Sequence, residues 1–254
     1  MLPTMKKLYY FSILIFLISC DFGSNDSGTD FYQGTSSGGS LARFTIVDDY
    51  LYIVNDFSLI PIEISNLQNP EAGDMIDLGI GIETIFPYQG NLFIGSSSAV
   101  FIFSLDDPKA PSLLSTFEHA TGCDPVVVSD GYAYVTLREG TSCNNFFELN
   151  TLEVLDVSNL NNPFLVNQIQ MNNPRGLGIG CNSKLFVCEG SSGFVQFDIT
   201  DPQNPKIDTT YSDHFATDVI VNDTLLIVTG DDGIYQYSCT GENLKLLSVV
   251  PISL

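Results

Sequence analysis

The segment Asp130-Gly131-Tyr132-Ala133-Tyr134-Val135 places a polar turn directly before a strand of β-forming residues, and this arrangement recurs along the chain. The recurrence opens near five residues that are 41, 41, 51 and 41 positions apart: Ala42, Glu83, Asp124, Arg175 and Ala216. A period of this length indicates small units that bury their apolar faces only by stacking on their neighbours. Residues 41–254 are therefore predicted to form one repeat domain.

Each repeat is predicted to begin with a hairpin whose turn is a polar pair of residues. Asn, Asp and Gly supply the backbone freedom that tight hairpins need. The five pairs are Asp48-Asp49, Gln89-Gly90, Asp130-Gly131, Asn182-Ser183 and Asn222-Asp223. The strands that return from these turns are residues 51–54, 92–94, 133–135, 185–187 and 225–228.

A third strand follows each hairpin, with two apolar residues spaced to lie on one face of a sheet. These pairs are Ile62 and Ile64, Phe103 and Leu105, Leu155 and Val157, Phe197 and Ile199, and Tyr237 and Cys239. Proline-containing turns at residues 65–70, 106–111, 158–163 and 200–205 then lead to a fourth, outer strand. The pattern predicts an all-β fold, a β-propeller of five blades with four antiparallel strands each; an open β-solenoid is the alternative.

Two stretches resemble a known repeat family. LEVLDVSN at residues 152–159 and FVQFDITDP at residues 194–202, each closing on a proline, look like the LVIVD repeat of bacterial surface and secreted proteins. Residues 123–128, 132–138 and 176–178 look like a lipoprotein branch of that family common in Bacteroidota. The resemblance implies a propeller-like fold and a lipoprotein. It weakens at Ser238 and Cys239, where the usual acidic and aliphatic pair is missing.

The first nineteen residues have the features of a signal peptide. Lys6 and Lys7 precede an apolar run at residues 8–18 that is too short to span a bilayer. The run ends in Leu17-Ile18-Ser19-Cys20, which resembles the lipobox of bacterial lipoproteins and implies that Cys20 is lipidated. An ordinary secretory peptide and an apolar cytosolic start are the alternatives. Residues 20–40, rich in Gly, Ser, Asn and Asp, are predicted to be a flexible linker behind the anchor.

The charge of the chain excludes one class of partner. Without Lys6 and Lys7 the mature chain has seven basic residues against 30 acidic ones, a formal net charge of −23. Such a surface repels phosphate backbones, so we expect no nucleic-acid partner. The lipobox resemblance implies a protein of the bacterial cell envelope, held at the outer membrane through Cys20.

One edge of the predicted hairpins gathers the chain's charged residues. The start of a first strand and the end of its returning strand meet at the same edge, which would surround the central channel. We call this edge the rim. Its predicted binding residues are Glu83, Asp124, Arg138, Arg175, Glu189 and Asp218, and the strand ends that they approach include Asp56, Ser96 and Asp231.

Three functions fit the rim. The first is a binding or scaffolding module for a protein or glycan partner. The second is an enzyme, for example glycan-active, with Asp124, Glu83 or Glu189 as acid or base and Arg138 or Arg175 holding an anionic group. The third is a structural envelope component whose rim charges form ion pairs between blades. We expect a binding module and no enzymatic activity.

Cysteines mark the third repeat, which is longer than the others because residues 139–150 are inserted. Cys123 and Cys143 both belong to the rim of this repeat and are predicted to form a disulfide, with two buried thiols as the alternative. Cys181, Cys188 and Cys239 remain. Cys181 and Cys188 lie at opposite ends of one hairpin and should not bond, and Cys188 and Cys239 are expected to be buried free thiols.

No catalytic or cofactor motif is evident in the sequence. His119 and His214 are isolated and are interpreted as turn or packing residues. The glycines of residues 176–180 lead into a strand and not a helix, so no phosphate loop is expected there. Residues 230–233 lack the spaced acidic series of a calcium loop. We therefore expect no cofactor and no metal site.

Overall fold

The computed structural model describes residues 39–119, 125–138, 150–241 and 243–252. These residues belong to the second of two compact units, Gln33–Leu254; the first, Met1–Tyr32, lies outside the described residues. The signal peptide, Cys20, Asp124, Cys123 and Cys143 also lie outside them. In the described part of the chain, no helix is long and apolar enough to cross a membrane.

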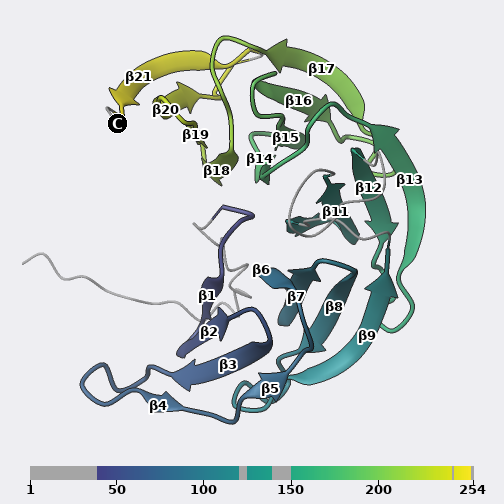
Figure 1. Cartoon of the computed structure of the whole chain (residues 1–254), viewed down its shortest axis with the longest axis vertical. Coiled ribbons are helices and arrows are strands. Elements are labelled where there is room, and N and C mark those ends of the chain that lie inside the picture. The colour runs from purple at the N-terminus through teal and green to yellow at the C-terminus, as the bar shows by residue number, and fades with distance from the viewer. Residues whose placement is uncertain (1–38, 120–124, 139–149, 242, 253–254) are drawn as a thin grey trace, which may run out of the picture. The chain divides into compact units, whose positions relative to one another are not determined.

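The described residues form five antiparallel sheets, and each sheet is one blade of the predicted propeller (Figure 1). Blade 1 contains β1 (Phe44–Val47), β2 (Tyr50–Val54), β3 (Ser58–Glu63), β4 (Glu71–Ala72) and β5 (Ile76–Asp77). Blade 2 contains β6 (Ile82–Tyr88), β7 (Asn91–Ser96), β8 (Ala99–Ser104) and β9 (Ser112–Glu118). Blade 3 contains β10 (Val126–Ser129), β11 (Tyr132–Leu137), β12 (Thr151–Asp156) and β13 (Phe164–Gln170).

Blade 4 contains β14 (Leu177–Gly180), β15 (Lys184–Cys188), β16 (Phe194–Asp198) and β17 (Lys206–Tyr211), and blade 5 contains β18 (Asp218–Asn222), β19 (Leu225–Thr229), β20 (Gly233–Ser238) and β21 (Lys245–Pro251). Strands pair in sequence order within each blade, except that the outer strand of blade 1 is split into β4 and β5, which both pair with β3. The inner strands β1, β6, β10, β14 and β18 contact one another in that order. The prediction of an all-β propeller of five blades is confirmed.

The hairpin turns have the left-handed backbone that the polar pairs predicted. Gln89 and Gly90 have φ values of 47° and 71°, and Asp130 and Gly131 have values of 50° and 78°. Two turns differ from the prediction. In blade 5 the register pairs Asn222 with Leu225, so the turn begins one residue later than expected. In blade 4 the turn has three residues with positive φ, Cys181 included, because Gly180 pairs with Lys184.

The core lies between successive blades. Tyr52, Phe93, Tyr134 and Phe186 occupy the same position of the second strand in blades 1 to 4, and none of them is exposed to solvent. The Tyr52 hydroxyl donates a hydrogen bond to the Pro108 carbonyl, 3.0 Å away, and the Tyr134 hydroxyl to the Pro202 carbonyl, 3.1 Å away. Both carbonyls belong to the proline turn of the following blade. The proline turns therefore hold adjacent blades together as well as ending their own third strands.

A disulfide joins the last two blades, which corrects the expectation that Cys239 is a free thiol. Cys181 and Cys239 are bonded, with their Cα atoms 5.7 Å apart. The three-residue turn of blade 4 carries Cys181 to the hairpin turn of blade 5, where both sulfurs lie about 4 Å from the carbonyl oxygen of Asp223. Cys188 is free and buried, as predicted. The Cys123–Cys143 pairing falls outside the described residues.

The contribution of the Cys181–Cys239 bond can be measured directly. The bond closes a loop with a sequence separation of 58 residues, and a loop of this size contributes about 4 kcal/mol in the chain-entropy model. We expect the double variant Cys181→Ala/Cys239→Ala to lose roughly that free energy of unfolding, measured by urea unfolding with circular dichroism.

A matched control is Cys188→Ala, which should keep the response of the wild type to reductant because Cys188 forms no disulfide. A double variant as stable as the oxidised wild type would contradict the expected contribution.

Candidate functional site

The described rim residues lie where the hairpin geometry predicted them. Glu83 is at a bulge of β6, Arg138 directly follows β11, Arg175 precedes β14, Glu189 follows β15, and Asp218 opens β18. All of them are at the same edge of their blades, where first strands begin and second strands end. In blade 4 the backbone N–H of Arg175 donates to the carbonyl of Cys188 at the end of β15, and in blade 5 Asp218 pairs with Thr229 at the end of β19. Asp124 lies outside the described residues.

Two arginines and one glutamate interact at this edge. Burial and the neighbouring Arg175 both lower the pKa of Arg138, and Glu83 opposes them. The Arg175 guanidinium lies over the Phe215 ring, with Cζ 5.1 Å from the ring centre. Its Nε is buried, with no hydrogen-bond partner among the described residues. The two arginine charges and the opposite charge of Glu83 thus act on one another at this edge.

Two hydrogen bonds fix the backbone of Arg175 in place. The Thr136 hydroxyl donates to the carbonyl of Arg175, 2.7 Å away, and so joins β11 to the start of blade 4. The backbone N–H of Arg175 donates a hydrogen bond to the carbonyl of Cys188, 2.8 Å away, and this bond attaches Arg175 to the end of β15. Arg175 therefore spans blades 3 and 4, and its position beside Arg138 follows from the packing of these blades.

Glu189 is held by the segment that follows β13. It is buried, and its Oε1 accepts a hydrogen bond from the backbone N–H of Asn172, 2.7 Å away. The Asn172 side chain approaches its other oxygen at 3.5 Å. This carboxylate thus ties the segment after β13 to the end of β15, and it acts as a structural link at the rim.

Asp218 is half-buried and holds the chain that precedes blade 1. Its Oδ1 accepts from the Ser40 hydroxyl, 3.2 Å away, and the Ser40 oxygen in turn accepts from the backbone N–H of Leu177, 2.7 Å away. Burial raises the pKa of Asp218 to about 6, although hydrogen bonds from Val219, Ser40 and Leu41 oppose the shift. Residues 39–41 are thereby fastened to the inner strands of blades 4 and 5.

Two glycines make room for the Asp218 carboxylate. A Cβ atom at Gly39 or at Gly176 would collide with its side chain. The same reason applies to Gly178 and Gly180, because a Cβ atom at either residue would lie too close to Val221 of β18. The glycine series at residues 176–180 is therefore explained by the close approach of β14 and β18.

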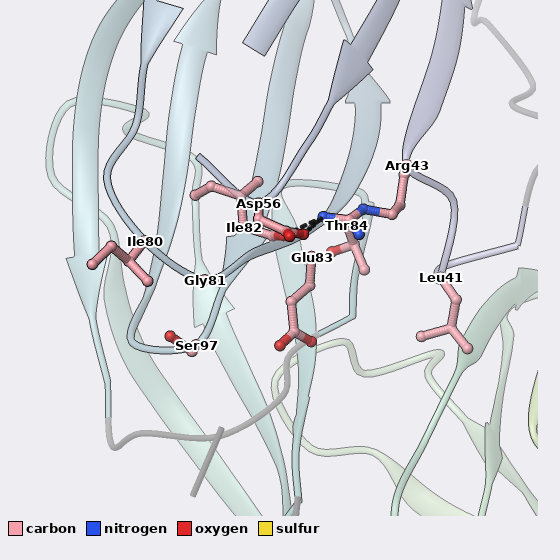
Figure 2. A pocket seen from close by; sticks show the side chains of 9 residues that line it. All are labelled: Leu41, Arg43, Asp56, Ile80, Gly81, Ile82, Glu83, Thr84 and Ser97. Carbon is pink, nitrogen blue, oxygen red and sulfur yellow. Dashed lines mark hydrogen bonds and ion pairs between the residues drawn. The ribbon is translucent and has the colours of Figure 1, made fainter. Parts of the chain in front are cut away.

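A hollow opens beside Glu83 at the blade 1 and blade 2 end of the rim (Figure 2). Its volume is about 560 Å³, and it is lined by Leu41, Arg43, Asp56, Ile80, Gly81, Ile82, Glu83, Thr84 and Ser97. Arg43 pairs with Asp56 at 2.6 Å and donates to the Ile82 carbonyl at 2.8 Å. Figure 2 shows the Glu83 carboxylate pointing away from that ion pair. The hollow is therefore lined by one ion pair and by a carboxylate that points away from that pair.

Sequence reasoning did not single out Ser40, Arg43, Phe215 or Glu153. Glu153, on β12, is buried; burial raises its pKa, and it accepts a hydrogen bond from Gln168 at 3.1 Å. A glutamate flanked by apolar residues inside a predicted strand is the signal that marks it. Within the described ranges, no group of three or more metal-ligating side chains is present.

His214 packs as a core residue. Its ring stacks on Tyr235, with centroids 3.7 Å apart, and burial lowers its pKa.

Comparison with known proteins supports the repeat and the fold. The LVIVD repeat family model matches residues 38–72 and 147–170. A crystal structure of a functionally unknown protein from Desulfotomaculum acetoxidans is similar, with a TM-score of 0.67 and 12% identity over 82% of this chain and 68% of that chain. A Lactobacillus plantarum protein has a TM-score of 0.60 and 13% identity over 85% of this chain and 70% of that chain.

A chain of the mitotic checkpoint complex is also similar, with a TM-score of 0.60 and 13% identity over 92% of this chain and 74% of that chain. No curated protein matches. At these identities the likeness shows the fold alone.

The half-buried carboxyl group of Asp218 predicts a specific pH dependence of stability. Its pKa is about 6 in the folded chain against an ordinary 3.8, so the unfolded chain loses this proton first as the pH rises. Its stabilising contribution is complete below about pH 4 and is lost as the pH rises to about 6, an effect of about 3 kcal/mol. We expect Asp218→Asn to lack this loss, measured as the difference in free energy of unfolding between variant and wild type.

The exposed Asp231→Asn is the matched control and should track the wild type at every pH. Parallel curves for Asp218→Asn and wild type between pH 4 and pH 7 would contradict the burial argument.

Proposed function

We propose that this β-propeller of LVIVD repeats is a lipid-anchored binding module of the bacterial cell envelope that holds a protein partner at its rim. The observation that carries the proposal is that the positive charges of Arg138 and Arg175 act on each other in a strongly acidic chain. A partner that presents a carboxylate would relieve the repulsion between these two charges. Solved structures of similar fold include a member of a protein complex, which supports a protein as the partner.

We propose binding and not catalysis. An acid–base pair needs carboxyl groups that face an open pocket. Glu189 accepts hydrogen bonds from Asn172, and Asp218, whose pKa is raised, is covered by Ser40 and does not line the hollow beside Glu83. Of the two carboxyl groups that line the hollow, Asp56 is already paired with Arg43. These arrangements favour a rim that recognises a partner.

The lipid anchor determines where the propeller would be located in the cell. The signal-peptide pattern and Cys20 support attachment at the outer membrane, and the linker before residue 41 supports a domain held beside the bilayer. The acidic surface, which is repelled by anionic head groups, supports a domain that stands away from the lipid.

Charge reversal at the rim tests the binding function. We expect Arg138→Glu to reduce recovery of the crosslinked partner from intact cells about tenfold or more, because it replaces an attractive charge with a repulsive one. Lys206→Glu, the same charge change on the exposed outer strand β17, should leave recovery unchanged.

The melting temperature of both variants separates binding from folding. An Arg138→Glu variant that melts lower and still captures the partner would show that Arg138 is structural. Capture that disappears after glycan removal would identify a glycan as the partner and overturn the choice of a protein.

Substitution of the predicted lipidated residue tests the placement. We expect Cys20→Ser to prevent incorporation of labelled palmitate and to move the chain out of the membrane fraction. Ser37→Ala, in the linker, is the matched control and should remain anchored. A Cys20→Ser chain that still carries label would contradict the lipoprotein assignment.

A further inference from the structure

The segment that joins blade 4 to blade 5 contacts both the core and the rim. Residues 212–217 lead from the outer strand β17 to the inner strand β18 (Figure 1), and they are called here the connecting segment. His214 is 8% exposed and Ala216 is fully buried. Phe215, between them, lies beneath the Arg175 guanidinium. One short segment thus links a buried histidine to a rim arginine.

Backbone hydrogen bonds attach the connecting segment to the residues around Arg175. Ala216 and Gly190 exchange two bonds, of 2.9 and 3.0 Å, between the segment and the turn after β15. The carbonyl of Thr217 accepts from the backbone N–H of Gly176, 3.0 Å away, and Gly176 directly follows Arg175 in the chain. The position of Arg175 therefore depends on the position of this segment.

Phe215 is closely packed at the rim end of the segment. A Cβ atom at Gly190 would lie 2.9 Å from Nε of Arg175 and 3.4 Å from Cζ of Phe215. A Cβ atom at Gly230 would collide with the backbone carbonyl of Phe215. Phe215 is thus held between two glycine-containing turns. Because close-packed groups transmit a displacement to their neighbours, a shift of the segment would change the support of the arginine.

Aromatic rings enclose the imidazole of His214. It stacks on Tyr235, with ring centres 3.7 Å apart, and its centre lies 5.8 Å from that of Phe194 and 6.1 Å from that of Tyr237. Its Nδ1 is 3.5 Å from the Tyr237 hydroxyl, and its Nε2 is buried with no hydrogen-bond partner among the described residues. A neutral imidazole has one N–H to satisfy, whereas an imidazolium has two and also carries a charge. The enclosure therefore suits the neutral ring.

Two carboxylates outside the enclosure would accept the charged ring. Burial lowers the pKa of His214, whereas Asp232 and Asp213 oppose the shift because they favour the protonated form. Both aspartates are exposed to solvent. Asp232 also accepts a hydrogen bond from the Tyr235 hydroxyl, 2.8 Å away. An imidazolium turned toward the surface would thus find water and negative charge together.

Tyrosines are the titratable groups that face the ring from the neighbouring strands. Tyr235 and Tyr237 belong to β20, and burial raises the pKa of both, so they stay neutral in acid. Tyr211, on β17, packs against Tyr237 with ring centres 6.4 Å apart. Protonation of His214 therefore adds an uncompensated charge inside the enclosure.

We propose that protonation of His214 moves the connecting segment and withdraws Phe215 from Arg175, so that the rim releases its partner in mildly acidic surroundings. The neutral ring is stabilised inside the aromatic enclosure, and the charged ring is stabilised beside Asp213 and Asp232. The segment thus has two arrangements, and the proton decides between them. This inference rests on the proposed function, because it supplies the regulation of that rim site.

Asp218 changes charge in a similar pH range with the opposite consequence. Its pKa is about 6, so acid removes a negative charge from the edge that carries Arg138 and Arg175. A partner that presents a carboxylate would bind such an edge more tightly. Loss of the partner in acid is therefore attributable to His214 and not to Asp218.

The chain contains no tryptophan and two histidines, so the movement can be measured without a partner. In NMR spectra of the full chain, the ring signals of His214, assigned with the His119→Gln variant, should titrate with a pKa below 6.5. Fluorescence of the Phe215→Trp variant should shift over the same pH range. Addition of His214→Phe, which keeps an aromatic ring and cannot take a proton, should abolish the shift, and addition of His119→Gln should not.

Recovery of the partner at two pH values tests the consequence for the rim. Photochemical crosslinking on intact cells should recover about fivefold less partner, or a larger reduction, at about pH 5.5 than at about pH 7.5 from wild type. His214→Phe should give equal recovery at both values, and His119→Gln should behave as wild type. His214→Gln, which also cannot take a proton, replaces His214→Phe if circular dichroism shows that the latter is misfolded.

The two measurements separate this proposal from the rim function on which it rests. A Phe215→Trp signal that is constant with pH, or that shifts equally in the presence of His214→Phe, overturns the coupling. Equal wild-type recovery at both pH values overturns the release, provided that Arg138→Glu reduces recovery. If Arg138→Glu has no effect, the proposed rim function fails and the release fails with it, whereas a signal that depends on His214 would still support the movement of the segment.

Discussion

The packing of one blade against the next is the constraint on which the other features of this protein depend. A sheet of four short strands cannot bury both of its apolar faces alone, so its stability comes from its neighbours. At each interface an aromatic side chain at the Tyr52, Phe93, Tyr134 or Phe186 position is removed from water, which contributes about 2 to 3 kcal/mol per residue. Tyrosine adds a hydrogen bond to the next blade's proline turn. The same packing brings the strand ends into one rim.

Local sequence patterns determined the strands and the turns. Alternating apolar residues and polar turn pairs act within a few residues of each other, so their effects are visible in the sequence. The Cys181–Cys239 bond was not predicted, since it depends on a three-residue turn in blade 4 that brings Cys181 to the neighbouring blade. The sequence predicted a turn of two residues there, so Cys181 was not expected near Cys239 and Cys239 was expected to be a free thiol.

The rim was predictable as a place but not as a set of contacts. Hairpin geometry alone brings Glu83, Arg138, Arg175 and Asp218 to one edge. Which of them interact depends on partners from distant segments, such as Phe215 beneath Arg175 and Ser40 beside Asp218. Such partners leave no periodic signal, because each occurs once. The structure thus distinguishes carboxylates that join segments, Glu189 and Asp218, from the neighbouring charges of Arg138 and Arg175.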